Sequence, residues 1–194
     1  MRFLTVIIGI LSVHCAFGEQ CHKSDTDSTV DCMKVIHPKH GELLASVPIM
    51  PQQCLENITN LLKDVRQRIE GRRSSNPQCM KNLLNRLDDI SNHYMAKIIT
   101  VDRSVKQRFI SAYTAVGNAM VGVRTCVWKP HSSCEKIQTC CSAVKSGLYA
   151  DRTVTEEDIS NFLIEFKTQF GKEYDSIINS IRDVQSDAIS KTFC

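Results

Sequence analysis

The sequence of 194 residues is poor in glycine, proline and tryptophan, with eight, five and one of them. So few glycines leave no phosphate-binding loop, and the G-x-S-x-G and H-E-x-x-H motifs of hydrolases are absent. The H-x-x-H motif from His37 to His40 contains Pro38, which works against convergence of the two rings on a metal. We therefore expect a protein that is not an enzyme and that holds no metal and no cofactor.

Neither sign of charge dominates, because 24 lysines and arginines face 21 acidic residues for a net charge of +3. The densest basic cluster consists of Arg66, Arg68, Arg72 and Arg73, and Glu70 interrupts it. A nucleic-acid-binding chain usually carries a basic stripe, whereas this cluster is typical of a solvated helix end and loop. We expect no nucleic-acid partner.

Only one long apolar run is present, and it covers residues 3–13. Arg2 precedes the run, and Ala16 and Gly18 supply small residues at the positions that signal peptidase reads before Glu19. The run is too short to span a membrane. The pattern predicts that residues 1–18 are a secretory signal peptide, that the mature chain has no transmembrane segment, and that it is extracellular.

Cysteine is abundant, and nine of the ten cysteines follow the expected cleavage site. No C-x-x-C pair occurs, so we expect structural disulfides rather than a redox motif or a zinc site. An odd number leaves one cysteine unpaired, and a disulfide-linked dimer is one use for it. The disulfide candidates are Cys21, Cys32, Cys54, Cys79, Cys126, Cys134, Cys140, Cys141 and Cys194.

Three of these positions allow a more specific expectation. Cys140 and Cys141 point about 100° apart if they share a helix, so they should bridge two different elements. Cys194 ends the sequence and is expected to tie the tail to the body of the protein. We expect the unpaired cysteine to be Cys32, in a polar segment.

Residues 19–51 are polar and are broken by prolines, which predicts an irregular arm tethered by its cysteines, with one short helix near 42–46. From residue 52 onward, apolar residues recur at steps of three and four, which indicates helices. The capping residues predict about five helices in an all-α, disulfide-stapled bundle that forms a single domain with the arm. The expected helices span 52–70, 77–100, 102–128, 133–147 and 155–189, the last with a kink at Gly171.

Two motifs point to modification. Asn57-Ile58-Thr59 is an N-glycosylation sequon in the first turns of the first predicted helix, and we expect a glycan on Asn57. Arg72 and Arg73 form a dibasic pair in a predicted loop, which makes them a candidate processing site. The alternative for this pair is a polar loop with arginines near a helix C-terminus, where the helix dipole favours them.

Two functions fit these features. The first is a secreted, non-enzymatic interaction protein whose helical surface binds an extracellular protein or receptor. The alternative is an extracellular carrier of a lipid or other small apolar ligand in a cavity between helices. A carrier should contain a closed apolar cavity, whereas an interaction protein should have a filled core and an exposed apolar patch.

Overall fold

The computed structural model describes residues 24–72, 76–128, 134–150 and 153–190. In these ranges the chain forms seven helices and no strand, which confirms the all-α prediction and corrects the expected number of about five. The predicted signal peptide, Cys21, Arg73 and Cys194 lie outside the described residues. The helices are α1 (Asp25–Ile36), α2 (Gly41–Ser46), α3 (Met50–Glu70), α4 (Pro77–Arg108), α5 (Ile110–Val127), α6 (Cys134–Leu148) and α7 (Glu156–Ile189).

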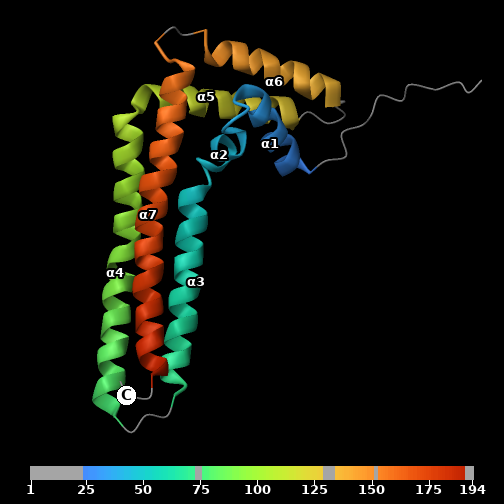
Figure 1. Cartoon of the computed structure of the whole chain (residues 1–194). Coiled ribbons are helices and arrows are strands. Elements are labelled where there is room, and N and C mark those ends of the chain that lie inside the picture. Colours follow the sequence, from blue (N-terminus) through green and yellow to red (C-terminus); the bar gives the residue numbers. More distant parts are fainter. Residues whose placement is uncertain (1–23, 73–75, 129–133, 151–152, 191–194) are drawn as a thin grey trace, which may run out of the picture.

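The three longest helices form an elongated three-helix shaft, in which α3 and α7 run in one direction and α4 runs in the other (Figure 1). Local sequence starts each of them. Pro51 lies in the first turn of α3, and the side chain of Asn76 accepts a hydrogen bond from the Cys79 amide at the start of α4. At α7, Thr155 and Asp158 form a reciprocal capping box, as the sequence predicts.

The other four helices form a head that lies across one end of the shaft (Figure 1). Disulfides join α6 to both of its neighbours. Cys141 bonds to Cys32 on α1, and Cys140 bonds to Cys126 on α5. The adjacent cysteines therefore bridge different elements, as predicted. The prediction that Cys32 is unpaired is wrong.

The cysteine that is free among the described residues is Cys54, half-buried on α3. Cys79 and Cys134 are also disulfide-bonded. Cys54 lies on the predicted core stripe of its helix, so its sequence context resembles that of a structural cysteine. The structure distinguishes Cys54 from the bonded cysteines, because no described cysteine lies within disulfide-bonding distance of it.

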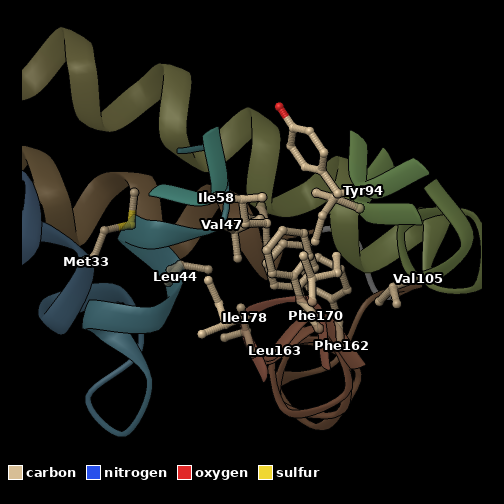
Figure 2. Packing of buried hydrophobic residues seen from close by; sticks show 14 of the residues in the cluster. Met33, Leu44, Val47, Ile58, Tyr94, Val105, Phe162, Leu163, Phe170 and Ile178 are labelled. Carbon is tan, nitrogen blue, oxygen red and sulfur yellow. The ribbon is translucent and has the colours of Figure 1, made fainter. Parts of the chain in front are cut away.

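Phenylalanines of α7 form the centre of the core. The rings of Phe162 and Phe166 lie 5.8 Å apart and those of Phe166 and Phe170 lie 5.4 Å apart, and all three side chains are buried. Figure 2 shows the surrounding cluster, to which α3 contributes Ile58 and α4 contributes Tyr94. Side chains at helical spacing on α7 therefore fill the space between the shaft helices, as its long apolar stripe predicts.

Two predicted boundaries are wrong. The N-terminal arm is not irregular, because Ser24 caps α1 by accepting a hydrogen bond from the Asp27 amide, and the polar run that follows forms the first turns of the helix. Asp102 does not cap a third shaft helix. It pairs instead with Lys106 inside α4, and the chain turns at Phe109, whose φ of −112° and ψ of 40° are not helical.

Candidate functional site

Three large apolar side chains lie exposed in a row along α5. Ile110, Val121 and Trp128 are 50%, 66% and 62% exposed. Val121 follows Ile110 by 11 residues and precedes Trp128 by seven, which is about three and two helical turns. The three side chains therefore share one side of the helix, over about 27 Å at 1.5 Å per residue. We call them the α5 row.

The opposite side of α5 is buried in the head and is also apolar. Its buried residues are Ala112, Val116, Ala119, Val123, Cys126 and Val127. The exposed side of α5 is mixed, because it also carries Ser111, Thr114, Asn118, Arg124 and Thr125. The row therefore places three large apolar side chains on a mixed surface, and one of them is a tryptophan, a residue type enriched at interaction sites.

An open groove of about 560 Å³ lies beside the row, between α5 and α6. The helices approach closely here, since a Cβ atom on Gly122 would lie 2.9 Å from Val144 Cγ2. None of the described lining residues carries a charge, and alanine, glycine and aliphatic side chains predominate. The lining residues are Ile110, Ser111, Thr114, Ala115, Asn118, Ala119, Gly122, Val144, Gly147, Leu148, Thr153 and Val154.

The stretch of sequence that contains α5 is basic. Residues 103–134 include five basic residues and no acidic one. Two of the five are neutralised by neighbours, because Lys106 pairs with Asp102 and Arg108 pairs with Glu165 of α7 at 2.9 Å. Arg124 is the only charged residue of α5, and its guanidinium carbon lies 5.7 Å from the centre of the Trp128 ring.

Sequence reasoning did not identify the α5 row. The apolar stripe that it selected on this segment includes Val116 and Val123, which do face the core. A signal was nevertheless present, because the 18 residues of α5 contain a single charge. Helical periodicity identifies the buried side of α5, but it does not single out the apolar residues that remain on the exposed side.

A second groove, of about 670 Å³, lies between α4 and α7 in the shaft. Its floor includes Ile90, Tyr94 and Ile177, and its walls carry charges of both signs. The exposed His93 shares a 2.7 Å hydrogen bond with the carbonyl oxygen of Asp89 in the preceding turn. The imidazole is thus held by its own helix, which is a common arrangement for an exposed histidine.

The described residues contain no group of three or more histidine, cysteine or acidic side chains that could hold a metal ion. Among the same residues, no helix has the length and apolar character needed to cross a membrane.

The predicted modification sites lie apart from the α5 row. Asn57 is exposed on α3, and the Thr59 hydroxyl lies 2.8 Å from the Tyr94 hydroxyl of α4. Arg72 follows α3, and its guanidinium donates a hydrogen bond to the carbonyl oxygen of Ala188 near the end of α7. Arg72, the first residue of the dibasic pair, is therefore hydrogen-bonded to the shaft.

Comparison with protein-family models, with curated proteins and with solved structures finds no match for this chain.

Proposed function

We propose that this chain is a secreted, non-enzymatic protein that binds an extracellular protein through the α5 row and the adjoining α5–α6 groove. The observation that carries the proposal is the exposure of Ile110, Val121 and Trp128 on one side of a helix whose other side already packs in the core. Exposed tryptophan at such a surface is typical of residues that dominate binding energy. The disulfides support secretion, because such bonds persist in oxidising compartments.

The charge around the row indicates which partner fits. No acidic residue occurs between residues 103 and 134, and Arg124 borders the row. Two copies of this chain paired through α5 would bring like charges together, which disfavours a homodimer. The groove is concave, so a partner with protruding apolar side chains fills it better than a flat surface does. We infer a protein partner with an apolar ridge bordered by acidic groups.

The test uses the labelled full-length secreted protein and intact cells, with and without protease treatment of the cell surface. We expect saturable, protease-sensitive binding. The variant Val121→Asp should weaken it by at least about tenfold, which corresponds to about 1.4 kcal/mol at an interface. Ile189→Asp is the matched control, because it adds the same charge at a similarly exposed aliphatic position, at the end of α7. Absence of saturable binding, or equal binding by the two variants, would overturn the proposal.

The alternative function, a carrier of a lipid or other small apolar ligand, is also supported by one observation. None of the described residues that line the α5–α6 groove is charged, so an apolar molecule could occupy it, although the groove is open and not the closed cavity expected of a carrier. Native mass spectrometry before and after mild organic extraction separates the two functions. A bound molecule of defined mass that leaves on extraction supports the carrier, and a polypeptide without ligand supports the interaction protein.

A further inference from the structure

A histidine is buried where the head meets the shaft. His37 directly follows α1 and is only 1% exposed. Its Nε2 lies 3.1 Å from Oγ of Ser160 on α7, so a hydrogen bond joins residues 123 positions apart. Its Nδ1 is buried and has no hydrogen-bond partner among the residues that the structure describes. Burial disfavours the charged ring here more than the carboxylate of Glu156 and the backbone of His37 favour it.

The charges around His37 mostly oppose protonation. The ring of His40, in the turn before α2, lies 5.0 Å away, and Lys145 of α6 adds positive charge. Glu156 of α7 opposes them, with a carboxylate oxygen 3.9 Å from Nε2, but this side chain is largely exposed and screened. Burial first, and His40 second, lower the pKa of His37 below its ordinary value of 6.5.

Two further charged groups on the elements that pack against α1 have contacts away from His37. Glu42 of α2 pairs with Lys34 of α1 at 3.2 Å. Arg124, the only charged residue of α5, lies beside the Trp128 ring. Neither contact offers an acceptor to a charged His37.

We propose that His37 and Ser160 form an acid-sensitive latch, which holds the turn between α1 and α2 against α7 while the ring is neutral and releases it when the ring is protonated. The disulfide between Cys32 and Cys141 keeps α1 attached to α6, so release opens the α2–α7 contact without detaching the helix. Endocytic compartments reach about pH 5–6, which is the range where such histidine switches act. A secreted protein taken up by a cell would therefore change shape at the base of its head.

The direction of the pH dependence follows from the difference in the pKa of His37 between the folded and the open form. The folded pKa lies below the unfolded value, so the open form binds the proton more readily. The stabilising effect of neutral His37 is complete above about pH 6.5 and is lost as the pH falls toward the folded pKa. Uptake of one proton on opening changes the opening equilibrium by at most about tenfold per pH unit.

Hydrogen exchange of the full-length protein, at about pH 7.4 and about pH 5 and corrected for intrinsic rates, tests the latch. We expect exchange in α1, α2 and the first turns of α7 to become several-fold faster at the lower pH. His37→Gln retains an amide for Ser160 but cannot be protonated, so its exchange should be unchanged by acid. His93→Gln, which removes an exposed histidine from α4, should behave like the natural protein.

Failure of the natural protein to open at the lower pH would overturn the proposal, and so would acid-induced opening that persists in His37→Gln. If His37→Gln does not fold, an NMR titration of the His37 ring in the natural protein tests the latch instead. The latch requires the His37 ring to become protonated over the same pH range in which hydrogen exchange in α1 and α2 becomes faster. A ring already charged at about pH 7.4, or one that is protonated while α1 and α2 stay protected, contradicts it.

Discussion

At Gly41 the backbone of α2 lies close to the backbone of α1, and replacement of this glycine tests how tightly the two helices pack. A Cβ atom added to Gly41 would lie 2.6 Å from both the Cα and the backbone nitrogen of Lys34. Backbone atoms inside a helix cannot rotate away as the end of a side chain can, so the two helices must separate. Overpacking of this kind usually costs about 1–3 kcal/mol. We expect Gly41→Ala to be destabilised by about this amount.

Gly171→Ala is the matched control. Gly171 lies inside α7, and nothing lies within 4 Å of the Cβ atom that alanine would add. Alanine should therefore stabilise the helix by roughly 0.5–1 kcal/mol. Urea unfolding followed by circular dichroism measures both variants, and thermal unfolding should shift by about 2–4 °C for each kcal/mol. The reasoning is refuted if Gly41→Ala is as stable as Gly171→Ala.

Three further predictions concern separate parts of the molecule. Burial raises the pKa of the Cys54 thiol above its ordinary value, so alkylation of this thiol should be slow at neutral pH and should accelerate at higher pH. A dimer band on a non-reducing gel that disappears in Cys54→Ser would contradict the prediction of an unreactive thiol. Secretion from a eukaryotic host should give a glycosylated chain, and Asn57→Gln should abolish the mass that an N-glycosidase removes; an unchanged mass would show that the sequon is unused. Phe166→Ala should lower the free energy of unfolding, measured with urea, by about 3–5 kcal/mol, because the ring is fully buried between two other phenylalanines of α7. A decrease below about 1 kcal/mol would mean that the core of the shaft is loosely packed.

Features that depend on near neighbours in the chain could be predicted from the sequence. The apolar stripe of α3 and its end at Glu70 agree with the structure because helical periodicity and capping are local properties. The capping box at Thr155 is local in the same sense. The divergence of Cys140 and Cys141 follows from helix geometry alone, so it was predictable although their partners were not.

Only the tertiary structure decided which surfaces meet. Cys32 pairs with Cys141 across 109 residues, and spacing in the chain carries no information about such a contact. The exposure of Val121 depends on how far the head covers α5, and the hydrogen bond of His37 depends on the position of Ser160 on α7. The helices are therefore set by local periodicity, whereas the α5 row and the His37 latch arise from packing between segments that are distant in the sequence.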